Sequence, residues 1–269
     1  MGAAERWAAD LAAWAIPEEI LAAADQSPYV WDRDLIRRMR PAPGSEAGPT
    51  TTRIGEALGP DGSLLDVGAG AGRLSMSFAE AGHRVTAVEP DRGMAHALEQ
   101  ESATRGVTVA LVTDRWPAPA VDPHTVAVSG HVVYDVAEIG PFLVGLHEAA
   151  RRRVVIECTT EHPRAHLNPL FEVLHGIGRP SAPTDGDLVD VVAEVVGVIP
   201  NRERWSRPGS ARFADLQELT AFYARQLALP AGRVPELLAL VEPHITEADG
   251  WLTLAGGERG VATIWWDRA

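Results

Sequence analysis

Strand and helix patterns alternate through the middle of the chain. Short runs rich in valine and leucine predict buried strands at residues 63–67, 84–88, 107–112, 124–129 and 153–157. Between them, apolar residues at helical spacing predict helices at 72–81, 91–104 and 138–150. Short apolar strands joined by helical crossovers are typical of a parallel sheet covered on both faces. The pattern therefore predicts an α/β fold with a doubly wound, mostly parallel sheet.

The last third of the chain is expected to complete this sheet. Further strands are predicted near 201–206 and 261–266, which gives a seven-stranded, Rossmann-like sheet. Residues 159–183 interrupt the alternation with four prolines and three histidines, and we interpret them as an inserted cap. After this cap, helices are expected at 185–196, 213–228 and 233–242.

The N-terminal region has its own pattern. Trp7, Leu11 and Trp14 recur near helical spacing and predict a first helix, and Ile16, Ile20 and Leu21 predict a second. A third short helix is predicted over 33–40. Residues 41–52 contain Pro, Gly, Ser and Thr without apolar periodicity, which is typical of a linker or mobile loop. We therefore divide the chain into a helical lid with its linker (1–52), a core (53–158), the cap (159–183) and a C-terminal segment that completes the sheet and adds helices (184–269).

Composition and charge exclude several classes of protein. Of the 269 residues, 46% are hydrophobic and 23% charged, which is ordinary for a globular protein. The basic residues are all arginine, and the formal net charge of −13 repels phosphate backbones and anionic lipid. No apolar run approaches the ~20 residues of a membrane span, and the acidic N-terminus does not fit a signal peptide. We expect a soluble, cytoplasmic protein that binds neither nucleic acid nor a membrane.

Two local features have structural explanations. Cys158 is the only cysteine, which excludes an intramolecular disulfide and a cysteine-ligated zinc site, and we expect a buried structural thiol. The basic run at 151–153 follows the helix predicted at 138–150. Cations at that place complement the negative end of the helix dipole, and we favour this interpretation over a nucleic-acid patch.

The most informative stretch is LLDVGAGAGRLS, residues 64–75, which joins a predicted strand to a predicted helix. Gly68, Gly70 and Gly72 allow a tight turn and close ligand approach, because no Cβ blocks the backbone. Asp66, at the strand end, can accept hydrogen bonds from loop amides or hold an amine. Glu89, at the end of the next strand, is placed to accept hydrogen bonds from both hydroxyls of an adenosine ribose.

Two common nucleotide-binding loops do not fit this stretch. A dinucleotide loop requires G-x-G-x-x-G, and counting from Gly68 puts Arg73 at the third glycine. A phosphate loop requires a lysine, which the chain lacks. The remaining alternative to a cofactor site is a ligand-free glycine turn in which Asp66 only caps the loop.

The D-x-G-x-G-x-G loop with its downstream acid resembles the first two motifs of class I S-adenosylmethionine-dependent methyltransferases. The resemblance continues through Asp114 in LVTDRW, which is similar to the acid beside the adenine amino group in this family. It extends into VSGHVVYDV at 128–136 and covers about residues 62–158. WAIPEEIL, RRRVVIE and HPRAHLNPLFEVLHG also resemble a group of actinobacterial methyltransferase-like proteins.

The resemblance implies that S-adenosyl-L-methionine is the cofactor and that the core binds it. The implied cofactor-binding residues lie in the glycine loop and at the ends of the second, third and fourth strands: Asp66, Gly68, Ala69, Gly70, Gly72, Glu89, Pro90, Asp114, Arg115, Trp116 and Ser129. The implied activity is methyl transfer. A non-catalytic protein that binds S-adenosylmethionine or S-adenosylhomocysteine, or an assembly partner on the same fold, is the alternative.

The segment after the fourth strand narrows the acceptor. Enzymes that methylate DNA-base amino groups resemble one another in an Asn/Asp-Pro-Pro-aromatic motif there, whereas this chain has Ser129-Gly130-His131-Val132. Metal-dependent catechol-type enzymes place an aspartate where Ser129 stands, and the cap histidines lack convincing metal-ligand spacing. We expect metal-independent transfer to a small molecule by a monomer or homodimer. The attacking atom (O, N, S or C) stays open.

His131 and Tyr134 are the candidate catalytic residues. The ordinary pKa of histidine, ~6.5, suits proton removal by His131 at the sheet edge, although packing against the cofactor is an alternative role. Tyr134 is placed to orient the acceptor or the cofactor's carboxylate. Aromatic faces suit a lid over a sulfonium. We assign Tyr29, Trp31 and His162 to the substrate side, whereas core packing is favoured for Trp7 and Trp14.

Overall fold

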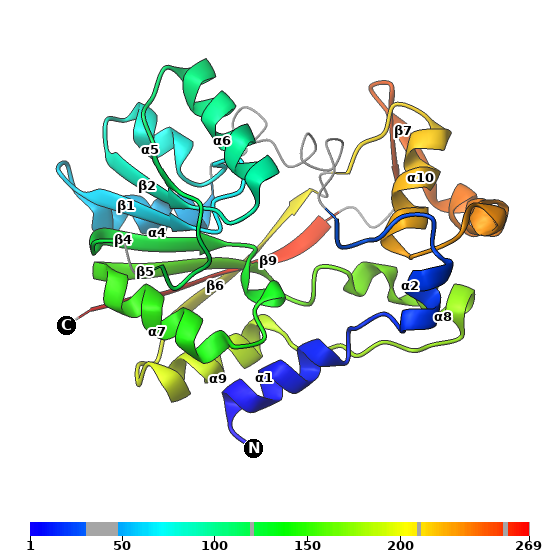
Figure 1. The fold of residues 1–269 in the computed structure, drawn as a ribbon, viewed down its shortest axis with the longest axis horizontal. Coiled ribbons are helices and arrows are strands. Elements are labelled where there is room, and N and C mark those ends of the chain that lie inside the picture. Colours follow the sequence, from blue (N-terminus) through cyan, green and yellow to red (C-terminus); the bar gives the residue numbers. More distant parts are fainter. Residues whose placement is uncertain (31–47, 119–120, 209–210, 255–257, 269) are drawn as a thin grey trace.

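A seven-stranded sheet of order β3-β2-β1-β4-β5-β9-β6 forms the centre of the structure (Figure 1). The computed structural model describes residues 1–30, 48–118, 121–208, 211–254 and 258–268. The sheet consists of β1 (Ser63–Val67), β2 (Arg84–Val88), β3 (Ala110–Val112), β4 (His124–Gly130), β5 (Ala150–Thr159), β6 (Asn201–Pro208) and β9 (Glu258–Asp267). Strands β1 to β5 are parallel, and β9 runs antiparallel to its neighbours. The predicted doubly wound, mostly parallel, Rossmann-like sheet is confirmed.

One edge of this sheet collects the ends of most strands. The strand order reverses between β1 and β4, and ligands of open α/β sheets bind outside the carboxyl ends at such a switch point. Both β5 and β6 pair antiparallel to β9, so they run in the same direction. The carboxyl ends of β1, β4, β5 and β6 therefore meet the beginning of β9 along one side, which we call the carboxyl edge.

Helices cover both faces of the sheet (Figure 1). One face packs against α1 (Ala3–Ala12), α7 (Ile139–Ala149) and α9 (Asp185–Val195), and the other against α4 (Pro49–Leu58), α5 (Met76–Glu80) and α6 (Arg92–Arg105). Strand alternation explains the division, since Leu65 and Val67 face the first group whereas Leu64 faces the second. No helix in the described ranges is long and apolar enough to cross a membrane.

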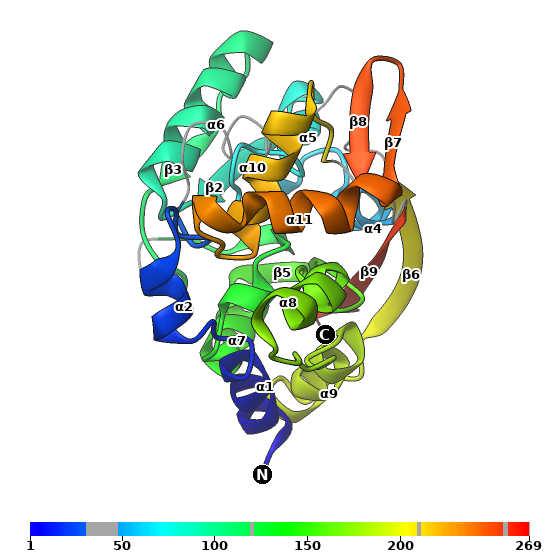
Figure 2. The same ribbon diagram turned by 90° about the vertical axis from the view of Figure 1, so that its right-hand side faces the viewer.

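A second core lies in front of the carboxyl edge in the view of Figure 2. It joins α8 (Asn168–His175) of the expected cap to α10 (Leu216–Gln226), α11 (Val234–Val241) and a hairpin of β7 (Ile245–Ala248) and β8 (Trp251–Leu254), with α2 (Glu18–Ala23) at its side. We call α8, α10, α11 and the hairpin the C-terminal lobe. The described residues also include four short 3₁₀ turns: η1 (Val133–Asp135), η2 (Ala165–Leu167), η3 (Ala231–Arg233) and η4 (Glu242–His244).

The structure corrects several local predictions. The helix expected at 72–81 is confined to α5, because the backbone at Gly72 has a positive φ of 87° that a helix cannot contain. The β7–β8 hairpin was not predicted, although its Asp249-Gly250 turn, with both φ values positive, is a known hairpin signal.

The basic run at 151–153 does not end a helix. α7 stops at Ala149 and β5 begins at the next residue, so the arginines lie on a strand. Arg152 donates to the carbonyl of Ala57 at 3.0 Å, and Arg153 pairs with Asp267 at 2.7 Å. The prediction that these cations complement the dipole of the preceding helix is therefore wrong. Arg152 and Arg153 tie β5 to α4 and β9 instead.

The N-terminal predictions are only partly within the described residues. The helix expected at 33–40, residues 41–47 of the linker and Trp31 lie outside them. Residues 49–52 of the expected linker form the first turn of α4. Trp7 is fully buried, stacks on Tyr134 and donates its indole N–H to the Val136 carbonyl at 3.0 Å. Trp14 is also buried, which agrees with core packing for both tryptophans.

Truncation of Trp7 tests whether α1 is part of the core. Trp7→Ala should lower the free energy of unfolding by about 3–5 kcal/mol, the usual cost of emptying a buried aromatic site. Trp251→Ala is the matched control, because Trp251 is 43% exposed, and it should cost less than about 1 kcal/mol. Denaturant titration followed by circular dichroism measures both. Equal effects would show that α1 is not held by this contact.

Candidate functional site

The glycine loop after β1 is fixed by backbone hydrogen bonds. The amides of Gly68 and Ala69 both donate to the Val88 carbonyl at the end of β2, at 2.8 and 3.2 Å. Gly68 has a φ of +71°, and a Cβ there would lie 2.2 Å from a methyl of Val132, so only glycine fits. Gly70 also has a positive φ, but no atom lies within 4 Å of its Cβ position. The loop is thus closed on the side of Gly68 and open at Gly70.

Asp66 is a buried carboxylate beside this loop. Its side chain is almost fully buried, and Oδ2 has no hydrogen-bond partner among the described residues. Burial raises the pKa of Asp66 to about 6, although the hydroxyl of neighbouring Ser75 and the charge of Arg73 favour the ionised carboxylate. Ser129 at the end of β4 does not satisfy it, because the Ser129 hydroxyl donates to the Val67 carbonyl at 2.9 Å. A buried acceptor without a donor is costly, and a bound amine would supply the missing donor.

Glu89 connects the glycine loop to the end of β2. Its Oε2 accepts from the Gly70 amide at 2.8 Å, and its Oε1 accepts from the Asp91 amide at 2.9 Å. Burial raises the pKa of this carboxyl. Each carboxylate oxygen has a further lone pair, so Glu89 can still accept hydrogen bonds from ligand hydroxyls. Pro90, the next residue, is exposed.

The residues that follow β3 lie at the same end of the sheet. Asp114 and Arg115 are exposed, and the Asp114 carboxylate accepts from the Arg115 amide at 2.8 Å. Trp116 is half-buried and donates its indole N–H to the Phe142 carbonyl of α7 at 3.1 Å. The carboxylate of Asp114 therefore faces solvent, whereas the indole of Trp116 is held against α7.

Glu157, on β5, is the most heavily bonded carboxylate at the carboxyl edge. Its side chain is only 1% exposed. Oε1 accepts from a guanidinium nitrogen of Arg73 and lies 2.9 Å from Nε2 of His131, while Oε2 accepts from the Thr50 hydroxyl at 2.6 Å. Although burial opposes ionisation, the hydrogen bond from His131 and the charge of Arg73 hold the pKa of Glu157 well below its ordinary value. Glu157 is therefore ionised at neutral pH.

A chain of hydroxyl groups extends this network to β6 and β9. The Trp205 indole on β6 donates to the Thr263 hydroxyl on β9 at 3.1 Å, and that hydroxyl lies 2.7 Å from the hydroxyl of Thr50. Because the Thr50 proton goes to Glu157, the Thr263 proton must go to Thr50. The network therefore links α4, β5, β6 and β9 through a single carboxylate.

His131 follows β4 directly and faces Glu157. Its φ of +59° is unusual for a non-glycine residue, and its amide donates to the Glu157 carbonyl at 2.7 Å. Burial lowers the pKa of His131, so the imidazole is neutral near pH 7. A neutral imidazole has one N–H, and Nε2 faces both the acceptor Glu157 and the donor-only guanidinium of Arg207, each at 2.9 Å, so these two partners favour opposite tautomers. The hydrogen bond to Glu157 requires the proton on Nε2. Nδ1 then carries the free lone pair.

The remaining candidates are engaged elsewhere. Tyr134 is buried, and its hydroxyl donates to the Thr159 carbonyl at 2.8 Å, so its single proton is committed within the protein. His162 stacks on Trp14 at a centroid distance of 3.8 Å, and burial lowers its pKa to about 3. Tyr29 is half exposed, with the Arg164 guanidinium 4.8 Å from its ring centroid.

Sequence reasoning missed the basic and acidic residues of the network. Glu157 carried a signal, since it is an acid within the otherwise apolar run VVIEC. Arg73 was noticed only because it breaks the dinucleotide motif. Arg207, whose guanidinium lies 2.9 Å from Nε2 of His131, comes from a strand far along the chain and had no local signal.

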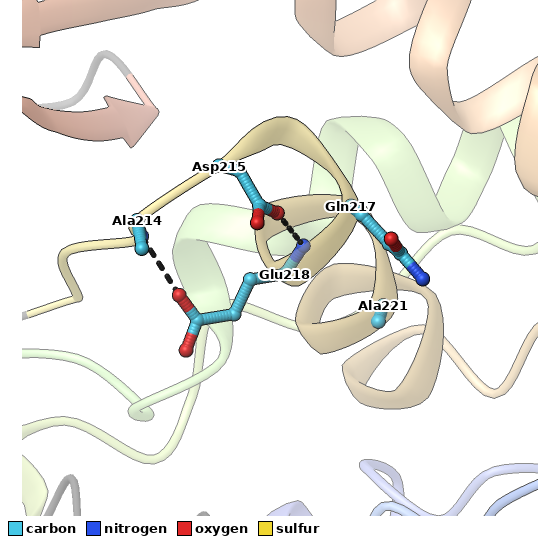
Figure 3. Close-up of a pocket in the computed structure, with 5 residues that line it drawn as sticks. All are labelled: Ala214, Asp215, Gln217, Glu218 and Ala221. Atoms are coloured by element: carbon cyan, nitrogen blue, oxygen red, sulfur yellow. Dashed lines mark hydrogen bonds between the residues drawn. The ribbon is translucent and has the colours of Figure 1, made fainter.

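A pocket on α10 is not part of this site. Figure 3 shows it on the first turn of the helix, lined by Ala214, Asp215, Gln217, Glu218 and Ala221. Asp215 caps the helix by accepting from the Glu218 amide at 2.8 Å, and the Glu218 carboxylate accepts from the Ala214 amide at 2.7 Å. Its polar groups thus serve helix capping. Within the described ranges, no group of three or more His, Cys, Asp and Glu side chains is arranged to hold a metal ion.

The middle of the chain matches a known protein family, and the fold is similar to solved structures. Residues 65–153 match a protein family described as a methyltransferase domain. Comparison with curated proteins finds no match. Among solved structures, a Bacillus halodurans protein provisionally described as a methyltransferase is similar with a TM-score of 0.55 at 11% identity, and the match covers 82% of this chain and 99% of that one.

Two further solved structures are similar over most of the chain. The YcgJ protein of Bacillus subtilis has a TM-score of 0.52 at 13% identity, over 80% of this chain and 97% of its own. The MccD protein has a TM-score of 0.52 at 14% identity, over 86% of this chain and 100% of its own. At these identities the likeness shows the fold.

Neutralising Glu157 should destabilise the protein. Glu157→Gln leaves nearby arginines without their carboxylate, and we expect a loss of about 3 kcal/mol of unfolding free energy at pH 7. Because the folded pKa lies below the ordinary 4.5, this stabilisation is complete above pH 4.5 and is lost as the pH falls further. In denaturant titrations, the difference in unfolding free energy between wild type and Glu157→Gln should therefore become smaller below pH 4.5.

Glu203→Gln is the matched control for this experiment. Glu203 lies on β6, is 40% exposed and pairs with Arg53 at 2.9 Å. Exposed ion pairs contribute little, so this variant should lose less than about 1 kcal/mol. A Glu157→Gln variant as stable as Glu203→Gln at pH 7 would contradict the role assigned to the buried carboxylate.

Proposed function

We propose that the chain transfers a methyl group from S-adenosyl-L-methionine to a small-molecule acceptor without a metal ion, and the match of residues 65–153 to a family described as a methyltransferase domain supports this. The observation that carries the proposal is the unsatisfied Oδ2 of buried Asp66, next to a glycine loop that is open at Gly70. Such a site accepts a ligand that brings an amine and needs a close approach to the backbone.

The residues of the loop fit the cofactor. Asp66 would hold its amino group, and the Gly70 backbone would lie against it without a side chain in the way. Glu89 would accept hydrogen bonds from the ribose hydroxyls with the lone pairs that Gly70 and Asp91 leave free. Asp114, at the surface beyond β3, would accept from the adenine amino group. These assignments are proposals for this chain.

The acceptor side lies next to His131. When bound, the cofactor supplies an electrophilic methyl group on a sulfonium. The chain must orient the acceptor, exclude water and take up a proton where the acceptor carries one. Nδ1 of His131 would take that proton, because Glu157 holds the opposite nitrogen and fixes the orientation of the ring. Ser129 at the end of β4 is a neutral hydroxyl bonded to Val67, which supports transfer without a metal ion.

Cofactor binding is the first test of this function. Glu89→Ala should weaken the binding of S-adenosylhomocysteine by about 1.5–3 kcal/mol, the scale of hydrogen bonds to a charged acceptor, which is roughly 10- to 150-fold in Kd. Gly70→Val should weaken it as well, because a branched side chain is strained at a φ of +56° and occupies the open space. Isothermal titration calorimetry measures both.

Glu99→Ala is the control for cofactor binding, since Glu99 is exposed on α6. It should bind as wild type does. Unchanged affinity for S-adenosylhomocysteine in both Glu89→Ala and Gly70→Val would show that the cofactor does not bind at this loop. Tight binding without formation of S-adenosylhomocysteine, across acceptors that offer O, N, S and C nucleophiles, would favour a non-catalytic binding protein.

Proton removal by His131 predicts a pH dependence. The single-turnover rate with an acceptor found in that screen should rise through an apparent pKa below 6.5, because burial lowers the pKa of this imidazole, and should be level above pH 7. In His131→Asn this rise of the rate with pH should be absent, and the single-turnover rate should be at least ~10²-fold lower. His96→Asn, which alters an exposed histidine of α6, is the control. A normal rate with weaker cofactor binding in His131→Asn would place His131 beside the cofactor only.

A further inference from the structure

Two arginines face each other at the carboxyl edge beyond the end of β5. Arg207 on β6 and Arg259 on β9 are direct partners in the antiparallel register of these strands. Like charges directly opposite each other on neighbouring strands are destabilising. The last pair between β5 and β9 joins Thr159 to Val261, so the two arginines extend past β5 toward the C-terminal lobe. A third arginine, Arg73 of the glycine loop, approaches the same place through Glu157.

The negative charge around these arginines does not balance them. Glu157 lies 3.7 Å from Arg207 and is already bonded by Arg73 and His131. Within the part of the chain that the structure describes, Arg259 has no carboxylate at ion-pair distance, and its guanidinium lies 3.2 Å from a ring nitrogen of His166. Among the described residues, with His131 neutral, the charges of Arg73, Arg207 and Arg259 face the carboxylate of Glu157, and Asp66 adds negative charge only on the side of Arg73.

These guanidinium groups are also partly removed from water. Only 29% of the Arg207 side chain is exposed, and burial lowers the pKa of both Arg207 and Arg259. Holding like charges together in a partly buried place costs free energy unless an anion is bound there. Arginine suits that purpose, because its planar group binds a carboxylate or phosphate through two parallel hydrogen bonds.

We propose that Arg207 and Arg259, with Arg73 beside them, bind an oxyanion of the methyl acceptor, a carboxylate or a phosphate. The proposal rests on the proposed function and names the class of its substrate: an anionic small molecule. Arg207 lies 2.9 Å from Nε2 of His131, so the bound oxyanion would lie near the proposed base. The two arginines would then position the acceptor with its nucleophile toward the carboxyl ends of β1 and β4, where the cofactor is expected.

The carboxylate of the cofactor is the other source of the same chemistry. Arg73 follows the glycine loop directly and is close enough to serve it. Arg207 and Arg259 lie on strands that β5 separates from β4, although the guanidinium of Arg207 reaches the same oxygen of Glu157 as Arg73 does. This separation favours the acceptor, and a binding experiment with the cofactor site filled distinguishes the two.

The test titrates three small probes into wild-type protein saturated with S-adenosylhomocysteine: benzoate, phenyl phosphate and the neutral benzamide. At least one anion should bind tenfold or more tightly than benzamide. In Arg207→Gln and Arg259→Gln this advantage should fall at least tenfold, while the affinity for S-adenosylhomocysteine stays within about twofold. Arg151→Gln, which removes an exposed arginine at the other end of β5, should behave as wild type does.

The outcomes separate the two proposals. Benzamide binding as well as both anions in wild type overturns the anion site, whether or not the variants fold. Anion binding that disappears when S-adenosylhomocysteine is present overturns it too, because the arginines would then serve the cofactor's carboxylate. Failure of S-adenosylhomocysteine to bind at all is a failure of the proposed function. In that case the anion titrations of the free protein still decide the presence of the oxyanion site.

Discussion

One buried carboxylate constrains the carboxyl edge. Glu157 is an ionised group with almost no exposure, and such a group is tolerated in a protein only when surrounding donors replace water. The donors come from α4, from the glycine loop and from the residue after β4: Thr50, Arg73 and His131. Satisfying this single charge therefore fixes the relative positions of segments that are far apart in the sequence. The orientation of the His131 ring and the path of the glycine loop follow from it.

The proposed site has two parts with different origins, one for the cofactor and one for the acceptor. The cofactor part is local in sequence, because Asp66, the glycines and Glu89 lie within one strand–loop–helix–strand unit whose backbone bonds close the turn. The acceptor part is assembled from distant segments by the register of β5, β9 and β6. The first part is shaped by backbone geometry and the second by charge. A locally encoded cofactor scaffold with an acceptor region assembled from distant segments is the arrangement expected of a fold that supports many reactions.

This division explains what the sequence predicted. The sheet and the glycine loop depend on local patterns, namely apolar runs, helical spacing and glycines between them, and those predictions agree with the structure. The role of Glu157 and of Arg207 depends on strand register, which no local pattern encodes. Tyr134 shows the same limit, since its position after β4 was predictable but its burial against Trp7 was not. The Asp249-Gly250 turn, by contrast, was a local signal that was overlooked.

The central claim is that the loop after β1 binds S-adenosylmethionine at the carboxyl ends of β1, β2 and β4. A crystal structure of the protein with S-adenosylhomocysteine tests it most directly. The account predicts the ligand between Gly70 and Ser129, with its amino group within about 2.7–3.2 Å of the Asp66 carboxylate and its ribose hydroxyls on Glu89. A ligand bound elsewhere, with Oδ2 of Asp66 still without a partner, would contradict the account.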